Sequence, residues 1–396
     1  MKQRLLFVAA GLAQAPAIRE ARKVGFHVTA MDGDASAPGL SEADASHVGN
    51  ILDVKEILRI ARLTQVQGIV SVCCDVAMEA VAEACVELGL PGIRPEVVSV
   101  SRSKLLQRDS MRAAGLLVPQ FAAVETADAA LESWDRFQSA AVVIKPVDAS
   151  GSRGVSYVSE RSQVAGTFEL ARQNSRSALV MIESFMPGAE YSVEAWVVGT
   201  EVHVLATSMK VRTQPPRLLD RQVHFPDDLP EQRRRIMIDH AVRGIKACGF
   251  RDCPVHLECI DSPQGPMIVE LAARGAGFKV FSEILPRVTG ISTVLASVAA
   301  SLGEVPDLTP KQAGVAASLV FIDPVPGIFR AARGVDAARA LTGVSEVVIY
   351  PVTGQQMNEL RSGSDRAGHI LVYAEDPAGC RVTAQAALDL IHIVPR

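Results

Sequence analysis

The sequence has no strong excess of one charge and no long apolar run. Its 396 residues hold 40 Lys and Arg against 44 Asp and Glu, a net charge of −4, so the basic surface typical of nucleic-acid binders is absent. No uncharged apolar stretch reaches the ~18–20 residues of a membrane helix. The seven cysteines include no C-x-x-C pair, which favours a reducing compartment. We therefore expect a cytoplasmic protein without a nucleic-acid or membrane partner.

Several motifs of known chemistry are also missing. The chain contains neither G-x-S-x-G nor H-E-x-x-H, which disfavours Ser-His-Asp hydrolysis and that class of zinc protease. It has no Gly-Lys dipeptide, which excludes the phosphate loop G-x-x-x-x-G-K-[ST]. The first turn reads A-A-G-L-A-Q-A-P instead of G-x-G-x-x-G. For Asp32, at the end of the next predicted strand, this favours a structural role over ribose binding.

One short stretch is rich in metal-ligand residue types. It holds Cys248, Cys253, His256 and Cys259, but their spacing matches no common zinc pattern. A helix end, a turn and a strand explain the same residues. The metal site stays an alternative, and the structural interpretation is preferred.

The order of predicted elements divides the chain into three parts. Short apolar strands alternate with helices over residues 1–100, which indicates a doubly wound parallel sheet. Residues 101–310 mix strands and helices, with a boundary between 178 and 179, and residues 311–396 form a smaller α+β domain. Within these parts we expect a short strand after 90–92, one helix over 101–114, a β-like stretch over 120–158 and a functional loop over 211–230.

The first candidate site is a lysine followed by small residues. Lys145 ends the apolar strand A-V-V-I-K, and the loop P-V-D-A-S-G-S-R-G-V follows it. An ammonium group there can neutralise phosphate oxygens, and the backbone N–H groups of residues 149–152 can approach them closely. A surface β-hairpin would give a similar pattern and remains open.

The second candidate site is a pair of acids on predicted strands. Glu258 lies in V-H-L-E-C-I and Glu270 in M-I-V-E-L-A-A-R. A carboxylate on a buried strand is costly unless it is paired or binds a metal, and two of them suit Mg²⁺ together with phosphate oxygens. Arg274 can clamp an anion. A structural ion pair between Glu270 and Arg274 is the alternative.

These motifs, in this order, resemble the ATP-grasp superfamily over nearly the whole chain. The segments that carry the resemblance are S-R-S-K-L-L-Q-R-D-S-M-R, V-V-I-K-P-V-D-A-S-G-S-R-G-V, V-M-I-E-S-F-M-P-G-A-E-Y-S-V-E and the two acidic strands. The resemblance implies an α/β N-terminal domain like that of biotin carboxylases. It also implies a central ATP-grasp fold of two α+β subdomains and a small C-terminal α+β domain.

The resemblance also implies roles for particular residues. Nucleotide binding would fall to Lys104, Lys145, Ser150, Gly151, Ser152, Gly154, Glu183, Phe185, Met186, Glu190 and Lys210, with adenine at Glu183 to Met186 and ribose at Glu190. The metal, Mg²⁺ or Mn²⁺, would lie on Glu258 and Glu270. Catalysis would use Lys145, Glu270 and Arg274, and Arg274 would grip the phosphate. The substrate candidates are His256, Arg274, His224 and Gly275, although for His256 a packed side chain is an equal alternative.

One position departs from the superfamily pattern. Many members read E-x-N-x-R at the last motif, whereas this chain has Ala272 in place of the asparagine. An asparagine ligand to the metal is therefore absent, and water or another group must replace it.

Within the superfamily the chain is most similar to the L-amino-acid ligases. G-L-A-Q-A-P-A-I-R-E-A-R, C-C-D-V-A, H-F-P-D-D-L-P and S-D-R-A-G carry this similarity. It implies an amide bond between a carboxylate and an amine, made through an acyl phosphate with release of ADP and phosphate, and it suggests a homodimer. A carboxyphosphate-dependent carboxylase, a purine-pathway type of ligase and a nucleotide-binding regulatory protein remain alternatives.

Overall fold

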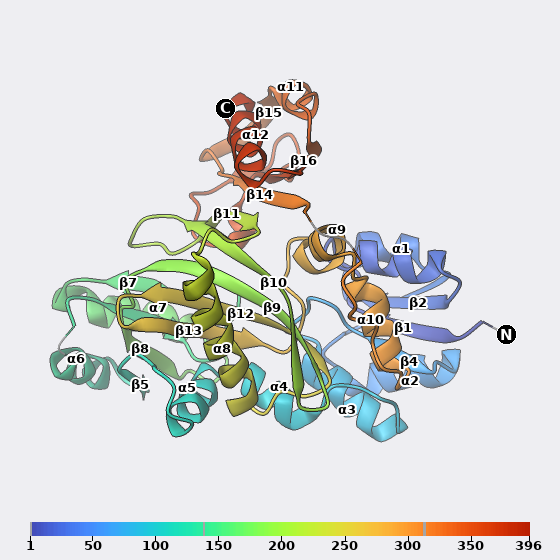
Figure 1. The fold of residues 1–396 in the computed structure, drawn as a ribbon, viewed down its shortest axis with the longest axis horizontal. Helices are drawn as coiled ribbons and strands as arrows, with labels where there is room; N and C mark the ends of the chain where they lie inside the picture. The colour runs from blue at the N-terminus through green and yellow to red at the C-terminus, as the bar shows by residue number, and fades with distance from the viewer. Residues whose placement is uncertain (1, 138, 312–313) are drawn as a thin grey trace.

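A parallel sheet organises the first domain (Figure 1). Its strand order is β3-β2-β1-β4, and the central strand β1 is apolar and almost entirely buried. The strands are β1 (Arg4–Val8), β2 (His27–Asp32), β3 (Ala45–Val48) and β4 (Gly68–Val70). The helices are α1 (Ala15–Lys23), η1 (Pro38–Glu42), α2 (Val54–Thr64), α3 (Met78–Leu88) and α4 (Pro95–Ser101). The computed structural model describes residues 2–137, 139–311 and 314–396.

The Asp32 carboxylate is hydrogen-bonded to backbone N–H groups within the first domain. It accepts a hydrogen bond of 2.7 Å from the backbone N–H of Ala10 in the first turn and one of 2.9 Å from that of Asp34. Its preferred structural role is confirmed, because both contacts tie the second strand to neighbouring backbone.

The second sheet is antiparallel, with the order β5-β8-β6-β7. It comprises β5 (Phe121–Val124), β6 (Val142–Pro146), β7 (Ser156–Val158) and β8 (Val180–Ser184), with α5 (Lys104–Ala113), α6 (Ala127–Arg136), η2 (Arg161–Gln163) and α7 (Val164–Asn174). The expected boundary at residue 179 is wrong for β8, because this strand pairs with β5 and β6 of the first subdomain.

The third sheet has eight strands, in the order β13-β12-β9-β10-β11-β14-β18-β16. Its ATP-grasp part comprises β9 (Ala189–Val198), β10 (Glu201–Arg212), β11 (Asp220–Phe225), β12 (Cys253–Ser262) and β13 (Gly265–Ala272), backed by α8 (Glu231–Ala247). The segment η3 (Val280–Ile284), α9 (Leu285–Thr289) and α10 (Thr293–Ser301) returns to the first domain, where α10 contacts α1 and β4.

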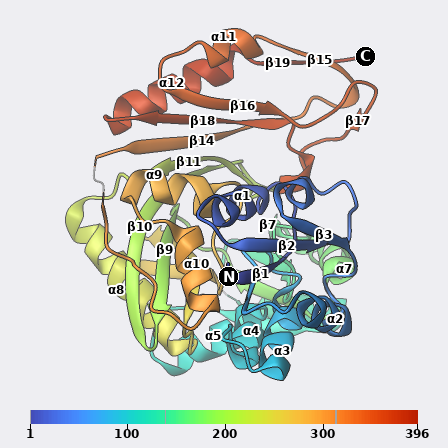
Figure 2. The same ribbon diagram turned by 90° about the vertical axis from the view of Figure 1, so that its right-hand side faces the viewer.

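The C-terminal domain continues this third sheet (Figure 2). β14 (Ala316–Ile322) pairs with β11, so the sheet crosses the domain boundary, and α12 (Pro377–Leu390) covers β14 and β18. The other elements are β15 (Gly327–Arg333), α11 (Val335–Arg339), β16 (Val344–Ile349), β17 (Gln356–Met357), η4 (Gly363–Asp365), β18 (Gly368–Ala374) and β19 (His392–Pro395).

Several expected elements differ from the structure. Residues 90–94 form no strand, the helix expected over 101–114 begins at Lys104 as α5, and the β-like stretch over 120–158 contains α6. The expected loop over 211–230 contains β11. Its strand pattern was hidden because β11 is only six residues long and mixes charged with apolar side chains.

No single described helix combines the length and apolarity needed to cross a membrane. One sharply bent pair, Val280–Thr289 with Thr293–Ser301, passes on length and composition alone.

Candidate active site

A cavity of about 350 Å³ lies between the second and third sheets. Strand alternation decides which side chains face it, because successive residues of a strand point to opposite faces. On β9, Glu190, Ser192 and Glu194 line the cavity, whereas Tyr191 and Val193 pack in the core on the other face. The same alternation sends polar residues of β10 and β12 into the cavity, and Glu270 reaches it from β13. The third sheet therefore provides a polar floor.

Lys145 and Glu183 form a buried ion pair on the second sheet. The Lys145 Nζ lies 2.6 Å from a Glu183 oxygen. Arg108, which is fully buried, donates to both oxygens of Glu183 at 2.6 and 3.2 Å. Burial alone would raise the pKa of Glu183, but Arg108 and Lys145 outweigh it and lower it to about 2. Glu183 therefore holds Lys145 in place. Both of its carboxylate oxygens already contact Arg108 or Lys145, although the sequence predicts that Glu183 faces adenine.

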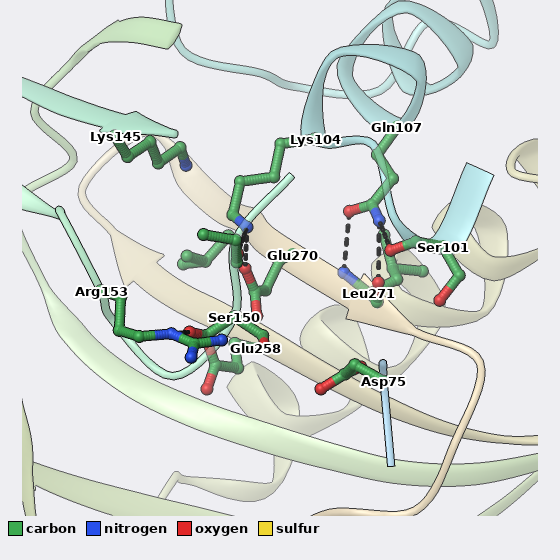
Figure 3. Close-up of polar contacts among 12 residues, drawn as sticks. Asp75, Ser101, Lys104, Gln107, Lys145, Ser150, Arg153, Glu258, Glu270 and Leu271 are labelled. Atoms are coloured by element: carbon green, nitrogen blue, oxygen red, sulfur yellow. Dashed lines mark hydrogen bonds and ion pairs between the residues drawn. The ribbon is translucent and has the colours of Figure 1, made fainter. Parts of the chain in front are cut away.

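Lys104 connects the phosphate loop to the acidic strands (Figure 3). Ser103 caps α5 and so places Lys104 at the first helical position. The Lys104 Nζ donates to the Ala149 carbonyl at 2.6 Å and lies 3.0 Å from a Glu270 oxygen. In the loop, Ala149, Ser150, Gly151 and Ser152 line the cavity. Residues 151, 152 and 154 have left-handed backbones.

Glu258 and Glu270 lie directly opposite each other on β12 and β13, and both line the cavity. The Lys210 Nζ contacts Glu258 and lies 3.2 Å from Glu190 and 3.1 Å from Asp220. Burial would raise the pKa of Glu258, but Lys210 and His256 hold it well below its usual range. Two adjacent carboxylates beside the predicted phosphate-binding lysines fit Mg²⁺, which takes one or two carboxylates plus phosphate oxygens.

His256 lies in the cavity next to these acids. Its Nδ1 lies 2.7 Å from Glu194 and its Nε2 lies 3.6 Å from Glu258. Burial lowers the pKa of His256, but Glu194 and Glu258 outweigh it and raise it to about 9. The imidazole is therefore a cation between two carboxylates. It also lies opposite Ala272, the position where the superfamily asparagine is missing.

The residues predicted to bind adenine and ribose also reach the cavity. Phe185, Met186 and Glu190 all line it. The Phe185 N–H already donates to the Ala141 carbonyl at 2.9 Å, so this residue can offer a nucleotide base only its carbonyl. Glu190 contacts Arg212 and Lys210, and burial raises its pKa to about 7 against their attraction.

Arg274 is held by the first domain. Its Nε and Nη2 donate to the two oxygens of Asp75 at 2.7 and 2.9 Å, and both residues line the cavity. Burial would raise the pKa of Asp75, but Arg274 lowers it below its usual range. The alternative partner named from the sequence, Glu270, is instead paired with Lys104.

Three predicted site residues do not line the cavity. His224 lies in β11, 3% exposed, with its Nδ1 2.8 Å from the Ser318 hydroxyl and its Nε2 2.9 Å from Gln222. A Cβ on Gly275 would lie 2.1 Å from the Phe281 ring, and one on Gly154 would lie 2.9 Å from the Asn174 side chain. The structure does not bring these three residues to the cavity: both glycines are closely packed, and the histidine is hydrogen-bonded within the sheet.

The cysteine cluster is not a metal site. Cys253 and Cys259 pack in the core on one face of β12, whereas His256 faces the cavity on the other. Within residues 2–137, 139–311 and 314–396, no group of three or more His, Cys, Asp or Glu is arranged to hold a metal. Cys253, His256 and Cys259 are close in sequence, but the alternation of side chains along β12 places the histidine on the opposite face from the two cysteines.

Sequence reasoning missed several cavity residues. These are Asp75, Glu194, Ser192, Ser208 and Arg366, together with Arg108 behind Lys145. Alternation along β9 from Glu190 predicts Ser192 and Glu194. No local signal could have found Asp75, because its partner lies 199 positions away.

The fold and cavity define the class of protein. Residues 138–282 match the family model of the ATP-grasp domain, so the chain contains an ATP-grasp domain. Residues 320–395 match the model described as L-amino acid ligase C-terminal domain 2. The last domain is therefore of the L-amino acid ligase type.

Similar proteins agree with this assignment. The L-amino acid ligase from Bacillus licheniformis superimposes with a TM-score of 0.86 at 20% identity, covering 100% of this chain and 99% of that one. The uncharacterized protein y4rH of Sinorhizobium fredii is 25% identical over 342 residues, which cover 85% of this chain and 70% of y4rH. Carnosine synthase 1 of Gallus gallus is 28% identical over 137 residues, covering 35% of this chain and 14% of the synthase.

These matches confirm the predicted ATP-grasp ligase family and fold class, and with the family its cofactors, ATP and Mg²⁺.

Proposed function

We propose that the protein joins the carboxylate of one amino acid to the amine of another, using ATP and an acyl-phosphate intermediate. The observation that carries the proposal is the meeting of Lys104, Lys145, Glu258, Glu270 and Arg274 in one cavity. They come from α5, β6, β12, β13 and the segment after β13. Similarity to an L-amino acid ligase and to a carnosine synthase supports amino acids as substrates.

The lysines would neutralise the phosphates during transfer. A substrate carboxylate oxygen attacks the γ-phosphorus, and ADP leaves. Lys145, fixed by Glu183, and Lys104, fixed by the loop carbonyl of Ala149, are positioned to offset the negative charge of the transferring group. Mg²⁺ on Glu258 and Glu270 would supply further charge neutralisation when bound.

Arg274 would act in the second step. The amine nitrogen attacks the acyl carbon, inorganic phosphate leaves, and the amine loses a proton to solvent or phosphate. Arg274 lies next to Glu270 in the cavity wall and presents a guanidinium fixed by Asp75. A fixed guanidinium suits the departing phosphate, because its planar donors match phosphate oxygens. No covalent enzyme nucleophile is required.

The proposal is tested by phosphate release with ATP, Mg²⁺ and all pairs of proteinogenic amino acids, with products read by mass spectrometry. Release that needs a particular pair, gives the condensed mass and disappears in Glu270→Ala supports it. The control, Glu169→Ala, removes an exposed acid of α7 and should retain activity. Phosphate release that requires bicarbonate would instead identify a carboxylase. ATP binding without phosphate release for any amino-acid pair would contradict the proposal and favour a regulatory role.

We also propose that the protein forms a homodimer, and sedimentation analysis tests this directly. A monomer at micromolar concentration would contradict it.

A further inference from the structure

Arg366, from the C-terminal domain, lies in the cavity wall without an acidic partner. The residue is 7% exposed and lines the cavity. Its Nη2 donates to the Asp220 carbonyl at 2.7 Å, and its buried Nε has no hydrogen-bond partner. Among the described residues it takes part in no ion pair within 4.0 Å, and the Asp220 carboxylate is directed to Lys210. The structure thus holds a buried guanidinium that no described carboxylate contacts, with Asp220 and Asp323 acting on it only from a longer distance.

Three separate segments fix this guanidinium. A capping box between Ser362 and Asp365 closes η4 immediately before Arg366. The guanidinium carbon lies 3.4 Å from the centroid of the Phe321 ring, on β14, and 4.6 Å from that of Phe278. Phe278 has a left-handed backbone, with a φ of 48°, an arrangement that costs free energy and persists where surrounding structure imposes it. Arg366 is therefore held in place and is not a mobile surface side chain.

A buried cation with no carboxylate in contact indicates an anionic ligand. Burying a charge without a partner is costly, and aromatic rings offset only part of that cost. Both rings lie against the guanidinium, and the N–H donors at the edge of a guanidinium have the geometry for carboxylate binding. The surrounding wall is apolar, with Leu319 and Val223 beside the two phenylalanines.

The two lysines proposed to neutralise the phosphates do not account for this position. The phosphate-binding lysines lie elsewhere, Lys145 on the second sheet and Lys104 at the start of α5 beside β13. Arg366 lies beside β14, four strands along the third sheet from the Glu258 strand β12. The Arg366 side chain contacts β14 and β11, whereas the two metal-binding candidates lie on β12 and β13, beyond β10 and β9 in the strand order.

We propose that Arg366 binds a carboxylate of the substrate other than the carboxylate that is phosphorylated, with the apolar part of that substrate against Phe278 and Phe321. This inference rests on the proposed function and names its substrate class. The carboxylate has two sources. It is either the α-carboxylate of the amino acid that supplies the amine, or the acidic side chain of a dicarboxylic amino acid.

The test measures binding by calorimetry to the full chain loaded with Mg²⁺ and ADP. One arm compares amino acids with their α-amides, and the other compares aspartate and glutamate with asparagine and glutamine. Wild type is compared with Arg366→Gln, with Arg366→Lys and with Arg361→Gln, a control at an exposed arginine of the same segment. Melting temperatures establish that each variant is folded.

We expect wild type to prefer the carboxylate in one arm by about 10- to 100-fold, the range for a charged hydrogen bond. Arg366→Gln should remove that preference, Arg366→Lys should retain part of it, and Arg361→Gln should retain all of it. The arm that responds identifies the source. Equal binding of acid and amide by wild type in both arms overturns the inference, and so does a preference that survives in Arg366→Gln.

Failure of the proposed function gives a different result. Hydroxylamine traps an acyl phosphate as a hydroxamate without any amino acid as the amine. Wild type that forms no hydroxamate from any amino acid contradicts the proposed function, whereas the Arg366-dependent preference is read from binding alone.

Discussion

Asp75 and Arg274 lie 199 positions apart and form a two-point ion pair, with distances of 2.7 and 2.9 Å, between the first domain and the ATP-grasp domain. Arg274 is the residue proposed to grip the leaving phosphate. The first domain thus determines where this guanidinium points. It also closes one side of the cavity, which both residues line.

A double-mutant cycle measures this pair. Asp75→Ala leaves Arg274 without its carboxylate, and Arg274→Met leaves Asp75 without its cation. We expect each change to lower the free energy of unfolding by about 1–3 kcal/mol, less than for a fully buried pair because the Asp75 side chain is 25% exposed. The double variant should lose little more than one single variant. Additive losses, measured by urea denaturation, would show that the two residues do not interact in solution.

Glu183→Gln separates a structural role from adenine binding. The substitution leaves Arg108, which is fully buried, and Lys145 without their carboxylate. We expect the free energy of unfolding to fall by about 3–5 kcal/mol, as when one member of a buried ion pair is removed. The sequence-based role predicts instead a raised KM for ATP and unchanged stability. Denaturation and ATP kinetics on the same protein decide between them.

Gly275→Ala tests packing beside the candidate site. An added Cβ would lie 2.1 Å from atoms of the Phe281 ring, so the ring must shift. We expect a loss of about 1–3 kcal/mol in unfolding free energy. Gly277→Ala is the matched control, because no atom lies within 4 Å of its added Cβ, and its effect should stay within about 0.5 kcal/mol. Equal thermal stability of the two variants would contradict the packing role.

His224 should make the protein sensitive to acid. Burial lowers the pKa of His224 to about 4, below the usual 6.5. The unfolded chain therefore takes up a proton at higher pH than the folded one, so stability is complete above pH 6.5 and falls as the pH drops toward 4. We expect this histidine to account for about 3 kcal/mol of the loss.

His224→Gln provides the comparison for that titration. The variant removes the titrating group, so its stability should change less than that of wild type between pH 6.5 and 4. Urea denaturation at intervals across this range measures the difference. Parallel curves for the two proteins would show that His224 does not titrate in this window.

Much of the fold and of the candidate site could be predicted from the pattern of residues along the strands. The parallel first sheet follows from alternating strands and helices, and Lys145 is recognisable because a lysine at the end of an apolar strand precedes a loop of small residues. The cavity faces of β9 and β12 follow from a period of two. The sequence did not show that β8 joins the first subdomain, because strand pairing depends on partners distant in the chain.

The sequence by itself determined the superfamily motifs, the two acidic strands and the two lysines, because these are local patterns of residue type. Only the tertiary structure decided their neighbours. In the folded protein Glu183 forms ion pairs with Arg108 and Lys145, and Arg274 forms one with Asp75. The fold also places Arg366 in the cavity wall and His224 outside it. The physical reason is that a buried charge is stabilised by whatever group the fold places within a few ångströms, and separation in sequence does not constrain that distance.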